Sequence, residues 1–300
     1  MNPVVRTLSA LAFLALPLAA AGRQEAVPAQ EAPKPAATKI EYLTAWPKPA
    51  DKDQLLSDVE RLVKSRTPEM GTQAHEALLA VGAAAVPYLL DRYGKEKDEG
   101  AHQRLHDILV EMIKADQTRL LAKSFESRNL HERVMALWRA GLFPDKEIRT
   151  AAEAAWTRVE KQGEKADAEE RYAAALCACS AGCIKGLDTL IAQALKKWDK
   201  RGPEMRVALE GVRGPEATAV LAKRLDDPDR KTRVAALRLL GGCGDKTIVG
   251  KIKPLLDESD NSLRVAAINA LRGIVDGQLP DETLSSFDAI AEAKKWKERL

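Results

Sequence analysis

The chain has 300 residues, of which 45% are apolar, only 4% aromatic and 30% charged, and its formal net charge is +3. This near-neutral balance offers no general argument for nucleic-acid binding, so we expect no nucleic-acid partner. The apolar residues are mostly Ala, Leu and Val, a composition that favours closely packed helices.

The first residues have the pattern of an export signal. A short segment with one basic residue, Arg6, precedes an apolar run from Leu8 to Leu18 and the small residues 19–21. Such an order is typical of a secretory signal peptide. The alternative is a transmembrane anchor, but the run is shorter than the ~20 residues that a span needs. We therefore predict a signal peptide over 1–21, a periplasmic or extracellular protein, and no stable membrane insertion after cleavage.

Residues 22–50 are rich in Pro, Ala, Gln and Lys and show no apolar period. This composition predicts a flexible tether. Within it, residues 40–46 form an apolar island that is a candidate to dock on the first repeat.

Apolar residues recur at helical spacing from near residue 51 to the end of the chain. Leu55, Val59 and Leu62 open the pattern, and glycines separate the later segments. No stretch shows the period of two that a strand requires. About seven antiparallel helix pairs are predicted. They are 74–81 with 85–93, 99–114 with 116–125, 129–141 with 145–161, 167–181 with 186–198, 203–211 with 215–225, 228–241 with 246–256, and 259–275 with 282–299. The last helix is expected to cap the array, with Trp296 covering its apolar seam.

One phrase, Asp-x-x-x-Arg-Val-Ala-Ala-(Leu/Ile), occurs at 229–237 and again 31 residues later at 260–268. A fainter copy lies at 206–209. A fixed period of this size indicates a repeat array. The first copy also suggests its helix boundaries: Asp227 would cap a helix that begins at Pro228, and the glycines at 241–242 would form the left-handed turn before the return helix.

The charged residues of the phrase suggest a ladder along the stack. The acid and the arginine lie four residues apart, so each pair could bond within its helix, or the arginine could reach the next repeat. The expected ladder consists of Asp229, Arg233, Asp260 and Arg264. Because an exposed ion pair contributes only ~0–1 kcal/mol, we expect apolar seams to hold the stack and the charges to set its register.

Residues 203–273 resemble a HEAT-like repeat of the short kind found in phycobilisome lyase subunits and many bacterial scaffold proteins. Residues 68–93 match this repeat moderately, and residues 94–200 match it only in the alternation of helices and breaks. The resemblance implies an all-α, armadillo-type α-solenoid over 51–300, with the second helix of each pair lining a concave face. It also implies either a scaffold or, as an alternative, a chromophore-lyase-like subunit.

The cysteines and two of the histidines are candidate chemical sites. Cys177, Cys179 and Cys183 cluster while Cys243 is distant, so no even disulfide framework is indicated. A Cys179–Cys183 or Cys177–Cys183 bond stays open, but buried free thiols are the favoured interpretation. His102 and His106 could share a metal, yet the glutamate of the zinc-protease pattern is missing. We therefore expect a solvated helix face there, and no metal site.

No phosphate loop, nucleophile elbow or dinucleotide fingerprint is present, so no catalytic residue and no cofactor are expected. Basic residues on successive second helices form a candidate partner-binding stripe, consisting of Lys196, Lys197, Lys223, Arg224, Lys251 and Lys253. We expect an exported, monomeric, non-enzymatic scaffold that binds a protein on its concave face. A purely structural envelope protein is a further alternative.

Overall fold

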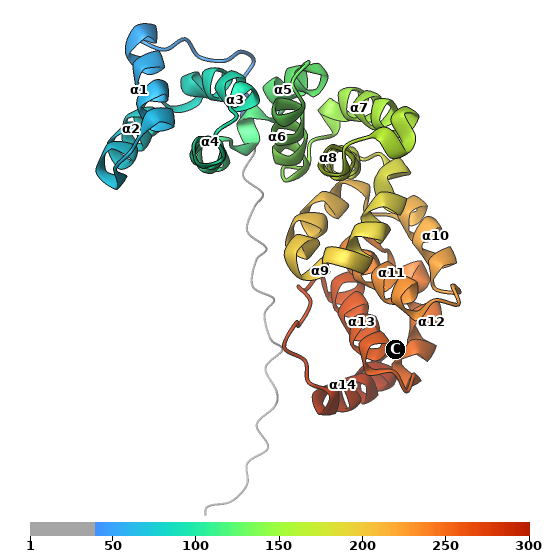
Figure 1. Ribbon diagram of the computed structural model, residues 1–300. Helices are drawn as coiled ribbons and strands as arrows, with labels where there is room; N and C mark the ends of the chain where they lie inside the picture. The colour runs from blue at the N-terminus through green and yellow to red at the C-terminus, as the bar shows by residue number, and fades with distance from the viewer. Residues whose placement is uncertain (1–39) are drawn as a thin grey trace, which may run out of the picture. The chain divides into compact units, whose positions relative to one another are not determined.

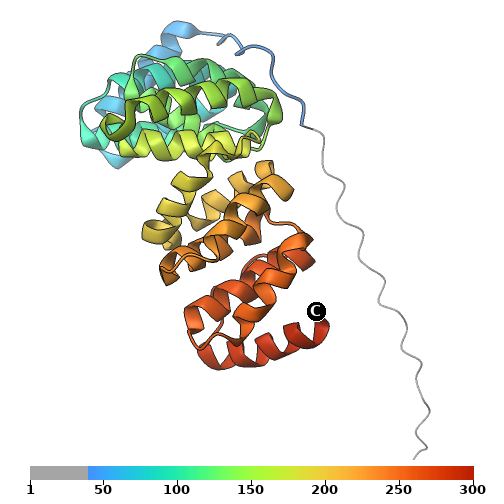
Figure 2. The same cartoon turned by 90° about the vertical axis from the view of Figure 1, so that its right-hand side faces the viewer.

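The computed structural model describes residues 40–300, so the expected signal peptide and most of the tether lie outside the described residues. From residue 40 onward the chain forms helices, turns and irregular segments but no strand. None of the helices in this part is both long enough and apolar enough to cross a membrane. The described unit is an all-α solenoid of paired helices that follow one another in chain order (Figures 1 and 2).

Its helices follow the predicted segments closely. They are α1 (Lys52–Lys64), α2 (Pro68–Val81), α3 (Val86–Lys95), α4 (Glu99–Met112), α5 (Thr118–Leu121), α6 (Leu130–Gly141), α7 (Arg149–Gln162), α8 (Ala168–Ser180), α9 (Leu187–Leu209), α10 (Pro215–Arg224), α11 (Arg230–Cys243), α12 (Val249–Ile252), α13 (Asn261–Leu271) and α14 (Ser286–Arg299). Short 3-10 turns extend α5, α7 and α12.

One row of neighbouring helices makes the central seam. α6 packs on α8, α8 on α9, and α11 on both α9 and α13. Leu237 and Ile268, which share a position in the repeat phrase, are fully buried in this seam. The alanines beside them are buried as well, which lets neighbouring helices approach closely. The apolar seam predicted from the phrase therefore exists.

Asp229, and not Asp227, caps α11. Its carboxylate accepts hydrogen bonds from the backbone N–H groups of Lys231 and Thr232, at 3.2 and 3.1 Å, so the helix begins at Arg230. Asp227 instead accepts from the N–H of Asp229. The predicted start at Pro228 was wrong because the carboxylate two residues later reaches the free N–H groups of the first turn.

Gly241 and Gly242 lie inside α11 and do not form the expected left-handed turn. Their function is close packing. A Cβ on Gly241 would lie 3.3 Å from the carbonyl oxygen of Asn269, and one on Gly242 would lie 3.0 Å from Leu209 Cδ1. These glycines therefore let α11 approach the helices on either side.

Helix α9 joins two segments that were predicted to be separate. The expected break at Gly202 is absent; the backbone is instead non-helical at Lys197, with φ −139° and ψ 27°. Pro203 lies within the second half of this helix, beyond the kink. Gly202 serves to admit the indole of Trp198, since a Cβ there would lie 3.0 Å from the ring.

The island at 40–46 docks on the stack, but around α5 and not on the first pair. The N–H of Leu43 donates to the carbonyl oxygen of Asp116 at 2.9 Å. The guanidinium of Arg119 lies 3.9 Å from the ring centre of Tyr42. Trp46 is half-buried against the core.

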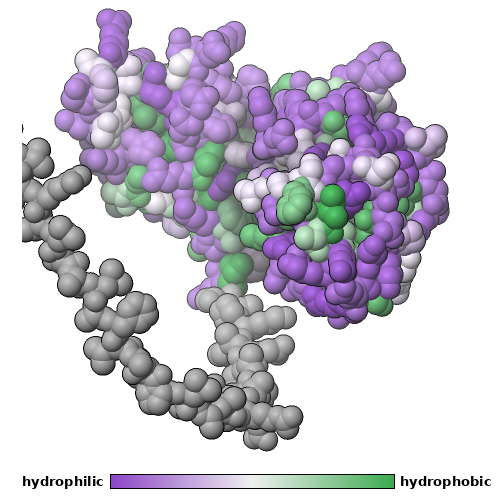
Figure 3. Space-filling view, turned by 90° about the horizontal axis from the view of Figure 1, so that it is seen from below, coloured by the Kyte–Doolittle hydropathy of each residue, from purple (hydrophilic) through white to green (hydrophobic). Residues whose placement is uncertain are grey.

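At the other end, Trp296 on α14 is buried and covers the last seam, as its spacing predicted. The exposed surface of α14 also carries large apolar side chains, since Phe287 is 81% exposed and Ile290 is 59% exposed. Figure 3, which views the unit from the side where α14 lies, shows hydrophobic residues within a mostly hydrophilic surface.

Candidate binding face

Two hollows lie over the row of first helices. The C-terminal hollow, of about 410 Å³, is bounded by the second half of α9, by α11 and α13, and by the loop 277–285. The central hollow, of about 330 Å³, is bounded by Tyr93 of α3, by α4, α6 and α8, and by the same half of α9. Residues 198–206 therefore form the wall between them. In Figure 1, α10 and α12 lie on the side of α11 and α13 away from the loop.

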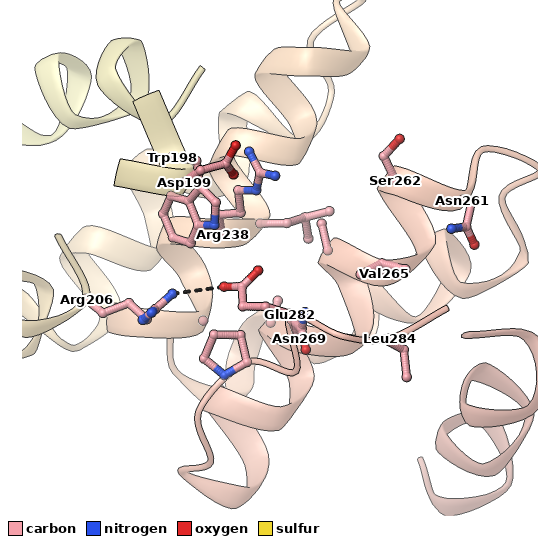
Figure 4. Close-up of a pocket in the computed structure, with 15 residues that line it drawn as sticks. Trp198, Asp199, Arg206, Arg238, Asn261, Ser262, Val265, Asn269, Glu282 and Leu284 are labelled. Carbon is pink, nitrogen blue, oxygen red and sulfur yellow. Dashed lines mark hydrogen bonds and ion pairs between the residues drawn. The ribbon is translucent and has the colours of Figure 1, made fainter. Parts of the chain in front are cut away.

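A tryptophan between two arginines dominates one end of the C-terminal hollow (Figure 4). The Trp198 ring centre lies 5.6 Å from the guanidinium carbon of Arg206 and 5.1 Å from that of Arg238. Asp199 lies beside them. Leu237, Val265 and Ala266 give the hollow an apolar floor, and Asn261 and Ser262 lie at its opposite end. Such a mixture of an aromatic ring, arginines and apolar side chains is typical of protein-binding hot spots.

The loop 277–285 lies across this hollow and is held by side chains of the stack. Asn269 donates from Nδ2 to the carbonyl oxygen of Asp281 at 3.1 Å and accepts at Oδ1 from the N–H of Asp281 at 2.8 Å. Arg206 Nη1 lies 3.1 Å from Glu282 Oε1. Arg272 Nε donates to the carbonyl oxygen of Leu279 at 3.3 Å.

Arg238 has no hydrogen-bond or ion-pair partner among residues 40–300. Burial lowers the pKa of its guanidinium, and the nearby carboxylates of Glu282 and Asp199 partly offset this effect. The hollow therefore contains a half-buried cation whose N–H groups are available to a ligand.

The central hollow is also aromatic. Its rings include His106 and Trp138, stacked with centroids 5.7 Å apart. The hydroxyl of Tyr172 donates to Glu204 Oε2 at 2.7 Å, and the guanidinium of Arg201 lies 3.8 Å from the Tyr172 ring centre. Burial raises the pKa of Tyr172, and the Glu204 carboxylate raises it further. This tyrosine therefore acts as a neutral hydrogen-bond donor.

His102 and His106 do not converge on a common point. The His102 ring stacks on Tyr93 with centroids 4.0 Å apart and meets His131 at 4.7 Å, whereas His106 stacks on Trp138. Burial lowers the pKa of His102, and His131 and His106 lower it further. Within residues 40–300 no three His, Cys, Asp or Glu side chains are arranged to hold a metal.

None of the six basic residues expected to bind a partner lines either hollow, although Lys197 pairs with Glu169 at the edge of the central one. Three of them are neutralised by neighbours: Lys197 lies 3.5 Å from Glu169, Arg224 2.8 Å from Asp188, and Lys251 2.6 Å from Asp226. Lys196 and Lys223 are exposed, and Lys253 is half-buried. The two hollows are lined mainly by first helices, whereas the expected stripe lies on second helices; which of the two faces binds a partner stays a prediction.

The residues of the expected ladder take different partners. Asp229 and Asp260 are helix caps, and Asp260 also pairs with Arg230 of the preceding repeat. Arg233 Nη1 lies 3.5 Å from Glu258 Oε1, while Arg264 donates to backbone carbonyl oxygens, including that of Leu256 at 3.3 Å. Neighbouring repeats are linked by charge, but through Arg230 and Glu258, which the spacing did not indicate.

All four cysteines are buried free thiols. Burial raises the pKa of Cys243 to about 12 and that of Cys179 well above its usual value. Cys243, Cys183 and Cys177 are close enough to Cys179 to add to this rise. Such thiols have little nucleophilic character at neutral pH.

Residues 218–299 match the family model of HEAT repeats. The match covers the last helix pairs, including α11, α13 and the loop that bounds the C-terminal hollow. No curated protein and no solved structure matched the chain. Together with the paired-helix stack, the match supports a HEAT-like repeat protein.

Proposed function

We propose that the protein is an exported, non-enzymatic scaffold that binds a partner protein on the face of its first helices. The observation that carries this proposal is the pair of adjacent hollows, each built from an aromatic side chain and an arginine. Trp198 with Arg238 serves one hollow, and Tyr172 with Arg201 serves the other. Aromatic residues and arginine are enriched at the centres of protein interfaces. The apolar run at 8–18 supports export.

Site-specific photo-crosslinking in the native cell tests the binding face. A photoreactive residue is placed at Ser262 in the C-terminal hollow, at Lys200 in the central hollow, or at Lys223 on α10; all three positions are exposed. We expect the same protein to be captured from Ser262 and Lys200 and not from Lys223. Capture from Lys223 alone would place the partner on the second helices and contradict the proposal.

The same cells also test whether the protein is exported. Sequencing of the exported form should give an N-terminus near residue 22, and an intact Met1 would contradict export by a cleaved signal peptide.

A further inference from the structure

Two residues at the same repeat position line the C-terminal hollow. Arg238 and Asn269 each lie four residues after the valine of the repeat phrase, Val234 in one copy and Val265 in the other. Both side chains point toward the hollow (Figure 4). The repeat therefore presents one polar side chain from each first helix to the same space.

Asn269 shows what this position can bind. Its amide pairs with both the N–H and the carbonyl group of Asp281, in a segment that belongs to no helix. An amide side chain that donates and accepts in this way recognises a peptide backbone whatever side chain that backbone carries. The surface thus already holds a non-helical peptide segment, which is supplied by its own chain.

Glu282 adds a carboxylate to the same segment. It pairs with Arg206, beside Trp198, and the two side chains are 56% and 23% exposed. A pair as exposed as this contributes only ~0–1 kcal/mol, so little free energy is lost when it opens.

The charge of the hollow depends on whether the loop is in place. With the loop, Arg206 and Arg238 face Asp199 and Glu282. Without it Glu282 leaves, and the two arginines outnumber the one remaining carboxylate. The vacated surface then favours an acidic ligand, and guanidinium groups suit carboxylates in particular.

We propose that the C-terminal hollow binds a non-helical, acidic segment of the partner protein, and that the loop 277–285 is a tethered competitor for that site. The partner's carboxylate pairs with Arg238 and Arg206, its backbone pairs with Asn269, and an adjacent apolar side chain packs on Trp198. The inference rests on the proposed function.

A synthetic peptide with the loop's own sequence tests the proposal. Fluorescein-labelled QLPDETLSS, residues 278–286, is titrated by fluorescence polarisation into the intact chain and into a variant whose residues 278–285 are replaced by alternating Gly and Ser. A short tether gives an effective concentration of about 1 mM. We therefore expect the loop-replaced chain to bind the peptide below about that concentration, and about tenfold more tightly than the intact chain does.

Three controls isolate the chemistry. The peptide QLPNQTLSS, which lacks both carboxylates, should bind about fivefold more weakly, since an ion pair of about 1 kcal/mol corresponds to that factor. Arg238→Gln in the loop-replaced chain should weaken binding similarly, while Lys223→Gln should not. Glu282→Gln in the intact chain should tighten peptide binding without any loop replacement, so the test does not depend on that variant folding.

Equal affinity of the peptide for the intact and loop-replaced chains would overturn the inference, as would equal affinities of the peptides with and without the two carboxylates. In that case a protein still captured from Ser262 would leave the proposed function standing. Failure to capture any protein from Ser262 or Lys200 would remove the proposed function itself.

Discussion

Arg133 on α6 holds the carboxylate of Glu170 on α8 through two hydrogen bonds, from Nε to Oε1 at 2.6 Å and from Nη2 to Oε2 at 3.1 Å. Arg158 on α7 adds a third, from Nη2 to Oε1 at 2.7 Å. Glu170 is only 1% exposed. Three consecutive helices are thus joined at one buried carboxylate.

Glu170→Ala should destabilise the chain by about 3–5 kcal/mol, because it leaves two arginines without their partner. Urea unfolding at pH 7 measures the change. Glu216→Gln, at an exposed position on α10, is the control and should stay within about 0.5 kcal/mol of the wild type. A loss below about 1 kcal/mol for Glu170→Ala would show that the carboxylate does not join the helices.

The same carboxylate should make the stability of the folded chain depend on pH in the acidic range. Burial raises the pKa of Glu170, but hydrogen bonds and charges from Arg133 and Arg158 outweigh burial and hold it below its usual value. Since the folded pKa is the lower one, its contribution is present above the unfolded value of about 4.3 and is lost as the pH falls through the folded pKa. Urea midpoints between pH 7 and pH 3 should fall more steeply for the wild type than for Glu170→Gln.

Leu237→Ala should cost more than Asp260→Ala. Leu237 is fully buried between neighbouring repeats, so its truncation should cost ~2–5 kcal/mol. The hydrogen bond from Arg230 lowers the pKa of Asp260 to about 2, and Asp260 caps α13, but loss of a cap costs ~0.5–2 kcal/mol. Thermal unfolding of the two variants side by side decides the order, and the reverse order would mean that charges hold the stack.

Gly211→Ala should destabilise, whereas Gly250→Ala should not. A Cβ at Gly211 would overlap the carbonyl oxygen of Ser180, and overpacking of this kind costs roughly 1–3 kcal/mol or more. Gly250 lies exposed in α12 with nothing within 4 Å of a Cβ, so alanine there should stabilise by up to ~1 kcal/mol. Similar melting temperatures for the two variants would refute the close approach at Gly211.

Stability should also fall between pH 7.5 and pH 5.5 because of His102. Burial, with His131 and His106 nearby, holds its folded pKa below the unfolded value, and Glu96 only partly offsets them. The unfolded chain therefore takes up the proton first as the pH falls through about 6.5. His102→Phe, which keeps a ring beside Tyr93, should flatten this part of the profile; an unchanged slope would assign the effect to other groups.

The thiols should resist modification in the folded chain. All four are buried, and burial raises the pKa of Cys243 to about 12. A thiol reagent at pH 8 should titrate none of them in the folded state and four in guanidinium chloride. Only two titratable thiols in the denatured chain would reveal a disulfide, and would support a Cys179–Cys183 or a Cys177–Cys183 bond.

The helices were predictable because the repeat phrase encodes them locally. Leu237 and Ile268 recur at one position and face one seam, so the period alone identifies the core. The helix starts at Asp229 and Asp260 are less certain from sequence, since Asp226, Asp227 and Asp229 compete for one cap. Only the path of the backbone decides which carboxylate reaches the N–H groups of the first turn.

The position of the two hollows was not predictable in the same way. A helical period shows which residues share a side, but not which row of helices borders a hollow. Lys223 and Lys251 lie on successive second helices, as expected, whereas the C-terminal and central hollows are lined mainly by first helices. The kink at Lys197 could not be read from the sequence either, since no glycine or proline lies at that position. One signal was available, however: Arg238 and Asn269 break the apolar pattern at the same repeat position.

The bent helix α9 carries residues that serve both hollows. Trp198 and Arg206 face the C-terminal hollow, while Arg201 and Glu204 face the central one. A ligand that shifts this short segment in one hollow should also move side chains in the other, because the same turns of α9 carry both sets. The two hollows should therefore be thermodynamically coupled, and double-mutant cycles between Arg238 and Tyr172 should show non-additive effects on binding despite the lack of direct contact.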